Sequence, residues 1–208
     1  MKQKASIFGI MIMLTMILSN NFLLSFTTDC DHLTSKKNSE EKLMSLNFES
    51  KRISKTSVIT LNAPLEQVFP LFGPIKEKEW ADGWSPEIVY SNTNLLEEHM
   101  VFRTQSHGHG ETNYTWIVTK YTPEQSLIEY TVFTMERLWC ITIKCNENTI
   151  NQTTDAEITY TYTGLTEKGN EINEKALQLM YSKDLKDWEE AINYYLETGK
   201  KLKLIDQH

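Results

Sequence analysis

Cysteine is scarce in this sequence, with three in 208 residues, and the spacing of the three excludes most cysteine chemistry. There is no Cys-x-x-Cys pair, and no cysteine and histidine stand at the spacing of a zinc site. Cys140 and Cys145 lie five residues apart on one expected strand, so their side chains should point to opposite faces and cannot bridge each other. We therefore expect two free, buried thiols.

Clusters of basic residues are also lacking, apart from the short run KKLKL at 200–204 within the tail 200–208. The 21 Lys and Arg residues are outnumbered by 28 Asp and Glu residues, which gives a net charge of −7. Nucleic acids and anionic membrane surfaces are bound through basic patches. The composition therefore excludes nucleic acid as a partner, and we expect contact with a membrane only through the N-terminal segment.

The sequence contains no nucleophile elbow, no phosphate-binding glycine loop and no pair of charged residues at a spacing typical of a catalytic site. The stretch HGHG places His107 and His109 where they could bind a metal, with Glu111 or His99 as a third ligand. Two glycines are typical of a tight hairpin turn, however, and two ligands from one turn are an incomplete site. We expect no metal and no cofactor, and no catalytic residue can be named.

The first thirty residues differ in composition from the rest. Lys2 and Lys4 precede an uncharged, mostly apolar run at 7–26, which indicates a signal peptide or an N-terminal membrane anchor. Lipidation of Cys30 is disfavoured because Asp29 stands where a lipobox has a small residue. The globular part is therefore expected to be periplasmic, secreted or anchored on the outer side of the cytoplasmic membrane. Residues 31–56 are polar and mixed in charge, as in a tether.

Residues 57–199 carry the pattern of one α+β domain. A β-branched run at 57–62 precedes two short helices that begin at Pro64. Later, apolar residues recur every three or four positions from Ile172 to Leu196, which predicts one long amphipathic helix between an N-cap at Thr166 and Gly199. Six further strands are predicted between these helical regions, at 87–92, 99–106, 113–121, 126–135, 138–145 and 156–164.

This order of elements predicts an α+β arrangement, in which a seven-stranded, curved antiparallel sheet wraps around the long C-terminal helix. A curved sheet cannot contact a straight helix along its whole length, so a cavity is expected between them. On the strand at 99–106, alternation places Met100, Phe102 and Thr104 on the side of the cavity, with His99 and Arg103 on the other side.

Four segments, APLEQVFPLF, GPIKEKEWADGW, VTKYTPEQ and KDWEEAINYYL, together with the order of elements, resemble the SRPBCC superfamily, which is START-like and birch-pollen-allergen-like. Within it, the chain is similar to the bacterial polyketide cyclase/dehydrase and lipid transport group. The resemblance covers residues 57–199 and implies a helix-grip fold with a deep cavity, which in relatives holds sterols, lipids, polyketides or plant hormones. The expected export signal distinguishes this chain from the many relatives that are cytosolic.

These observations predict an exported protein that binds a small hydrophobic molecule, lipid-like or aromatic, in a central cavity. One alternative is a cyclase/dehydrase-type enzyme, which a buried His, Asp or Glu in the cavity would favour. Another is a cell-envelope interaction module with no ligand. The oligomeric state stays open.

In the segment 73–87, we expect the charged residues to face water, Trp84 to act as a lid and Trp80 to support it. The residues expected to line the cavity are Phe72, Trp80, Trp84, Phe102, Thr104, Tyr130, Ile158, Tyr160, Met180 and Tyr181.

Overall fold

One antiparallel sheet dominates the computed structural model, which describes residues 48–105 and 113–203. Its strands are β1 (Arg52–Leu61), β2 (Glu87–Tyr90), β3 (Val101–Gln105), β4 (Asn113–Thr122), β5 (Leu127–Phe133), β6 (Arg137–Asn148) and β7 (Thr153–Gly164). Their order across the sheet is β1-β7-β6-β5-β4-β3-β2, and every neighbouring pair is antiparallel. This arrangement confirms the predicted seven-stranded sheet.

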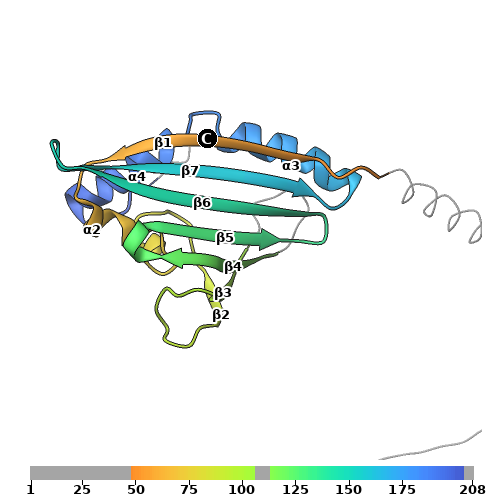
Figure 1. Cartoon of the computed structure of the whole chain (residues 1–208), viewed down its shortest axis with the longest axis horizontal. Helices are drawn as coiled ribbons and strands as arrows, with labels where there is room; N and C mark the ends of the chain where they lie inside the picture. Colours follow the sequence, from red (N-terminus) through yellow and green to blue (C-terminus); the bar gives the residue numbers. More distant parts are fainter. Residues whose placement is uncertain (1–47, 106–112, 204–208) are drawn as a thin grey trace, which may run out of the picture. The chain divides into compact units, whose positions relative to one another are not determined.

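The helical elements lie at two places in the sequence, as expected. Between β1 and β2 come the short α2 (Leu65–Val68) and the 3-10 helices η1 (Phe69–Phe72) and η2 (Lys76–Glu79). A third 3-10 helix, η3 (Pro123–Gln125), joins β4 to β5, and α3 (Glu167–Met180) and α4 (Lys186–Thr198) follow β7. Figure 1 shows α3 and α4 one after the other behind the sheet, along β1 and β7.

β6 lies inside the sheet, between β7 and β5, and its side chains alternate strictly in burial. From Arg137 to Cys145 every second side chain is buried, while the residues between them are half-buried on the other face. Cys145 accordingly lies on the inner face and Cys140 on the outer face, and both are free thiols. Burial raises the pKa of Cys145 to about 12, so this thiol is inert at neutral pH. The predictions that both thiols are free and lie on opposite faces are confirmed, whereas the prediction that both are buried holds for Cys145 and not for the half-buried Cys140.

The first strand begins at Arg52, five residues before the expected start of the domain at residue 57. Its first half is polar because β1 is an edge strand whose outer face is exposed, so hydrophobicity gave no signal there. The hydroxyl groups of Ser54 and Thr56 lie 2.9 and 2.7 Å from those of Thr161 and Thr159 on β7. Residues 52–56 therefore belong to the sheet and not to the tether.

The single C-terminal helix predicted from the periodicity is interrupted between Met180 and Lys186. Asp184 and Leu185 both have positive φ, at 50° and 61°, which no α-helix accommodates. Leu185 is fully buried at this break and so contributes to the core without continuing the helix. The predicted ends are confirmed, because the Thr166 hydroxyl accepts a hydrogen bond from the Gly169 amide at 3.0 Å and Gly199 is the C-cap.

Several sequence-based predictions lie outside the described residues. These are the leader at 1–30 with Cys30, the tether at 31–47 and the HGHG stretch. Within the residues that the structure describes, no helix is long and apolar enough to span a membrane. The same residues contain no group of three or more His, Cys, Asp or Glu side chains arranged to hold a metal.

Candidate ligand cavity

A cavity of ≈340 Å³ lies between the concave face of the sheet and the helices. Its volume is near the lower end of the range of ~300–1,000 Å³ that is typical of small-molecule sites. Side chains from η1, η2, β3 to β7, α3 and α4 form its wall. The residues that line it are Phe72, Glu77, Trp84, Thr104, Tyr114, Trp116, Tyr130, Arg137, Trp139, Ile141, Ile143, Tyr160, Tyr162, Ala176, Leu179, Met180 and Trp188.

Six aromatic rings of this wall form a continuous chain of contacts. It consists of Trp84, Trp116, Trp139, Tyr162, Tyr160 and Trp188, with successive ring centroids 5.4, 6.4, 5.8, 6.0 and 6.4 Å apart. Most of these pairs meet edge to face, which is a favoured geometry for aromatic rings. Because ring faces and edges surround the cavity, its wall is suited to a flat, apolar ligand.

Glu77 places a carboxyl group in this aromatic wall. Burial raises the pKa of Glu77 to about 8, because the charged form has lost its hydration. Its side chain is half-buried and lines the cavity. The expectation that the charged residues of 73–87 all face water is therefore wrong for Glu77. Its neighbour Glu79 does face outward, where its carboxylate accepts a hydrogen bond from Lys76 at 2.8 Å.

Two tyrosines, Tyr130 and Tyr160, line the same cavity as Glu77. Burial, together with the nearby Glu77 carboxyl group, raises the pKa of both Tyr130 and Tyr160 well above the usual value, and Tyr162 contributes at Tyr160. The Tyr130 hydroxyl donates a hydrogen bond to the Phe72 carbonyl oxygen at 2.7 Å, which ties β5 to η1. The Tyr160 hydroxyl and the Glu77 carboxyl group make no hydrogen bond or ion pair with any other described residue. Both are available to a ligand.

Arg137 provides a cation at the other end of the cavity. Only 3% of the residue is exposed, and its guanidinium group lies 4.6 Å from the ring centroid of Trp139 and near the rings of Tyr114 and Tyr162. Arg137 is four residues along β6 from Ile141, a distance of about 13 Å in a strand. Since Ile141 pairs with both Tyr130 and Tyr160, the cation is well separated from the Glu77 end.

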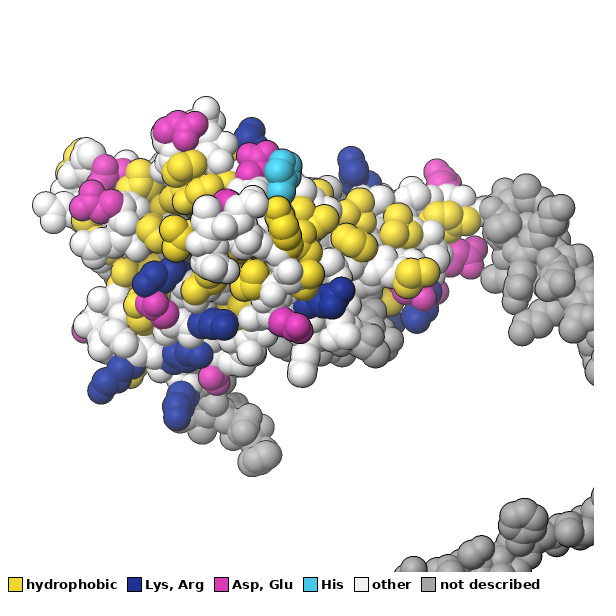
Figure 2. All heavy atoms as spheres, turned by 90° about the horizontal axis from the view of Figure 1, so that it is seen from below, with side chains coloured by type: hydrophobic (Ala, Val, Ile, Leu, Met, Phe, Trp, Pro, Cys, Tyr) yellow, Lys and Arg dark blue, Asp and Glu magenta, His cyan; other side chains and the backbone are white. Residues whose placement is uncertain are grey.

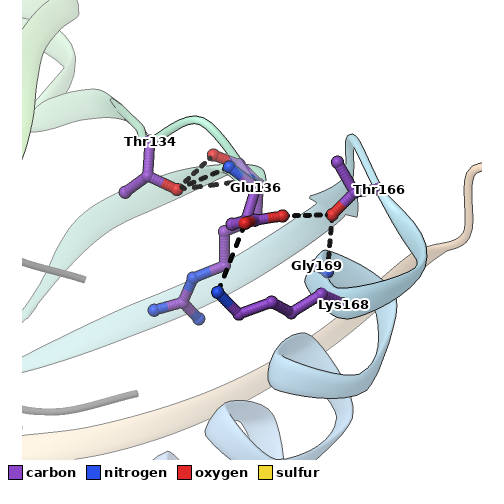
Figure 3. A network of polar contacts seen from close by, with 6 residues as sticks. Thr134, Glu136, Thr166, Lys168 and Gly169 are labelled. Atoms are coloured by element: carbon purple, nitrogen blue, oxygen red, sulfur yellow. Dashed lines mark hydrogen bonds and ion pairs between the residues drawn. The ribbon is translucent and has the colours of Figure 1, made fainter. Parts of the chain in front are cut away.

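A polar network beside Arg137 holds the start of α3 against the turn between β5 and β6 (Figure 3). The Glu136 carboxylate accepts hydrogen bonds from the Thr166 hydroxyl and from the Lys168 ammonium group. In the turn itself, the Thr134 hydroxyl accepts hydrogen bonds from the amides of Glu136 and Arg137 at 3.2 and 3.3 Å. The Thr166 hydrogen bond, followed by Lys168, holds the pKa of Glu136 below its usual value. This network fixes the backbone from which Arg137 projects.

Six of the ten residues expected at the cavity do line it: Phe72, Trp84, Thr104, Tyr130, Tyr160 and Met180. Trp84 projects from the loop after η2, and its indole N–H donates to the Pro74 carbonyl oxygen at 2.8 Å. Thr104 accepts a hydrogen bond from the indole of Trp116 at 2.9 Å. Their part in ligand binding stays a prediction.

The other four, Trp80, Phe102, Ile158 and Tyr181, are buried but do not line the cavity. Trp80 packs on the far side of Trp188, with ring centroids 5.7 Å apart, so it supports that ring and not Trp84. Phe102 stacks behind Trp116 at 5.4 Å. The Tyr181 hydroxyl donates to the Ile158 carbonyl oxygen and accepts from the Tyr160 amide, both at 3.1 Å, which attaches the helix break to β7.

The list of expected residues lacks eleven that line the cavity: Glu77, Tyr114, Trp116, Arg137, Trp139, Ile141, Ile143, Tyr162, Ala176, Leu179 and Trp188. Arg137, Trp139, Ile141 and Ile143 alternate along β6, so the period of two could have identified them as one face. Glu77 carries no such signal, because a four-residue 3-10 helix is too short to show a period.

The cavity reaches the surface beside Leu179, which lines it and is 66% exposed. Other exposed apolar residues, Val89, Tyr90 and Leu95, lie on and just after β2. Figure 2, which views the molecule from the side of β2 and β3, shows hydrophobic side chains gathered among charged ones.

No protein-family model matches the sequence, and no curated protein is similar to it in sequence. Solved structures are similar in fold. A norcoclaurine synthase point mutant from Thalictrum flavum, in complex with a transition-state analogue, has a TM-score of 0.55 at 12% identity, covering 74% of this chain and 100% of that chain. An aromatase/cyclase from a Streptomyces species has a TM-score of 0.54 at 13% identity, covering 72% of this chain and 94% of that chain.

Ara h 8.0201 has a TM-score of 0.51 at 14% identity, covering 72% of this chain and 99% of that chain. These three proteins are of the birch-pollen-allergen-like, SRPBCC kind, as the resemblance in the sequence implied. At such low identity the similarity concerns the fold alone. The chain has the helix-grip fold of SRPBCC proteins.

Proposed function

We propose that this protein binds a small, flat, largely aromatic molecule in the cavity between the sheet and the helices. The observation that carries the proposal is the continuous chain of six aromatic rings around a space of ≈340 Å³. Aromatic walls bind flat ligands through stacked and edge-to-face contacts, and a preformed space keeps the cost of ordering low. A ligand-free interaction module has less support, because its cavity would be filled by side chains.

Binding can be tested by extracting the purified protein and by measuring thermal shifts with naphthalene derivatives. At a hundredfold excess over the dissociation constant, a ligand should stabilise the fold by about 2.7 kcal/mol. Replacing Trp84 with Ala removes one ring from the wall, so we expect affinity to fall about tenfold or more. The matched control is Tyr90→Ala, an exposed aromatic residue on β2. An empty extract with no thermal shift would refute the proposal.

A second candidate function is acid–base catalysis of the cyclase/dehydrase kind, and Glu77 is the observation that favours it. A carboxyl group with a pKa of about 8 can give and take a proton near neutral pH. One of the structures similar in fold is named an aromatase/cyclase. Exchange of the methyl-ketone hydrogens of acetonaphthone with solvent deuterium distinguishes the two functions. Acceleration by the wild type that Glu77→Gln abolishes favours catalysis, and no acceleration favours binding alone.

We also propose that the domain is exported. The support is the basic start and apolar run at 1–26, which is typical of a secretory signal or an N-terminal anchor. Fractionating bacterial cells that express the full chain, followed by N-terminal sequencing, tests this. Full-length protein in the soluble cytoplasmic fraction would contradict export.

A further inference from the structure

Glu77 and Tyr160 place two polar groups at one end of an otherwise aromatic cavity, and neither group bonds to another described residue. An unpaired polar group in such surroundings costs free energy unless something else satisfies it. The Tyr160 ring lies 6.4 Å from the ring of Trp188, which in turn lies 5.7 Å from that of Trp80. The Trp80 amide donates a hydrogen bond to the Glu77 carbonyl oxygen at 3.3 Å, so Glu77 and Tyr160 belong to the same end of the cavity. A polar atom of a ligand at this end would therefore meet both groups.

The surroundings determine which form of Glu77 a ligand meets. The titratable residues that line the cavity besides Glu77 are Tyr114, Tyr130, Arg137, Tyr160 and Tyr162, and α3 contributes none. Asp187 on α4 raises the pKa of Tyr160, as Glu77 does. The one cation of this set, Arg137, lies at the opposite end. Among the described residues, an ionised Glu77 would have no cation beside it, so the carboxyl group holds its proton at neutral pH.

We propose that this end of the cavity binds an oxygen atom of the ligand, a carbonyl or phenolic oxygen, through hydrogen bonds donated by the Glu77 carboxyl group and the Tyr160 hydroxyl. A protonated carboxyl group in an apolar site is a good donor, and a tyrosine hydroxyl beside it supplies a second bond to the same oxygen. The inference rests on the proposed function and adds the chemical class of the ligand, an aromatic compound with an oxygen at one end.

Three probes with one skeleton test the inference, namely acetonaphthone, ethylnaphthalene and naphthylethylamine, measured by equilibrium dialysis with the full chain. At about pH 6 we expect the ketone to bind about tenfold more tightly than the hydrocarbon, and the difference to vanish by about pH 9.5, where Glu77 is ionised. The amine tests the competing possibility of a cation site. It should bind most weakly at the lower pH.

Variants assign the effect to the two donors. Glu77→Gln keeps an N–H donor that does not titrate, so the ketone preference should persist at both pH values. Glu77→Leu and Tyr160→Phe should each lower ketone affinity several-fold and leave the hydrocarbon unaffected. Glu79→Gln, on the outward side of η2, is the matched control and should change nothing. Circular dichroism verifies that each variant is folded.

The possible failures are distinguishable. If ketone and hydrocarbon bind equally, the cavity binds aromatic molecules and only the oxygen site is refuted. If the amine binds most tightly and Glu77→Gln abolishes this, the end is a cation site and the inference is wrong. If none of the three probes binds the wild type, the proposed binding function fails together with the inference.

Discussion

The two ends of the cavity are built in opposite ways. At one end Glu77, on a 3-10 helix of four residues, is a carboxyl group without a charged partner in the part of the chain that the structure describes. At the other, Arg137 is a buried cation that lies over three aromatic rings and beside a network joining the β5–β6 turn to α3. In Figure 1 the two ends correspond to the side of α2 and to the side where α3 begins.

This difference separates two ways of keeping an ionisable group inside a protein. Arg137 stays charged, and the faces of its aromatic neighbours compensate part of its lost hydration. No aromatic face or cation compensates Glu77 among the described residues, so its protonated form has the lower free energy. Stability should therefore depend on packing at the Arg137 end and on pH at the Glu77 end.

The largest expected effect is at Gly169, where α3 meets the β5–β6 turn. A Cβ atom there would lie 1.9 Å from the Glu136 carbonyl oxygen, so Gly169→Ala must displace backbone. We expect the free energy of unfolding in urea to fall by about 4 kcal/mol. The control Gly199→Ala has open space and a positive φ of 67°, so it should cost only about 1 kcal/mol. Equal losses would show that the contact is not tight.

The next effect is the pH dependence that Glu77 imposes on stability. Its folded pKa of about 8 lies above the usual value of 4.5, so between these pH values the folded chain keeps a proton that the unfolded chain loses. Wild-type stability should therefore fall, relative to Glu77→Gln, as pH rises from 4.5 to about 8, by on the order of 3 kcal/mol. Below 4.5 both states are protonated and the difference should be small.

Denaturant titrations of both proteins across this pH range measure the difference. Glu79→Gln provides the control, because the hydrogen bond from Lys76, followed by that from Tyr195, lowers the pKa of Glu79. The stability that ionised Glu79 contributes is constant above 4.5 and is lost only as pH falls below that value, so Glu79→Gln should add no pH dependence between 4.5 and about 8. A constant difference between wild type and Glu77→Gln would mean that Glu77 is ionised in the folded protein.

The contrast between the ends also explains what sequence reasoning could find. The alternation on β6 is local and strict, so a period of two predicts the strand and its buried face. The polar first half of β1 was missed because an exposed edge strand lacks that alternation. Which glutamate of KEKE faces inward depends on how η2 packs against η1 and the rest of the fold, and no local pattern encodes this. The break at Leu185 contains neither Gly nor Pro, and it follows directly after Tyr181, whose hydroxyl bonds to β7.

Removing the cation itself should have an intermediate effect. Arg137→Ala deletes a buried side chain that covers Trp139 and two tyrosine rings, so we expect a loss of about 2 kcal/mol in the free energy of unfolding. Arg103→Ala, on the exposed face of β3, should change stability by less than about 0.5 kcal/mol. If both substitutions cost the same, the aromatic neighbours do not compensate the buried charge.

The smallest effects distinguish the parts of the network beside Arg137. Thr166 caps α3 through its bond to the Gly169 amide, so Thr166→Ala should cost about 1 kcal/mol. The ion pair of Lys168 and Glu136, at 3.3 Å, involves a lysine side chain that is 58% exposed, so Lys168→Ala should cost less than about 0.5 kcal/mol, and still less in high salt. Thermal unfolding at low and high salt measures both. If Lys168→Ala costs more than Thr166→Ala, the surface ion pair and not the helix cap holds α3 on the turn.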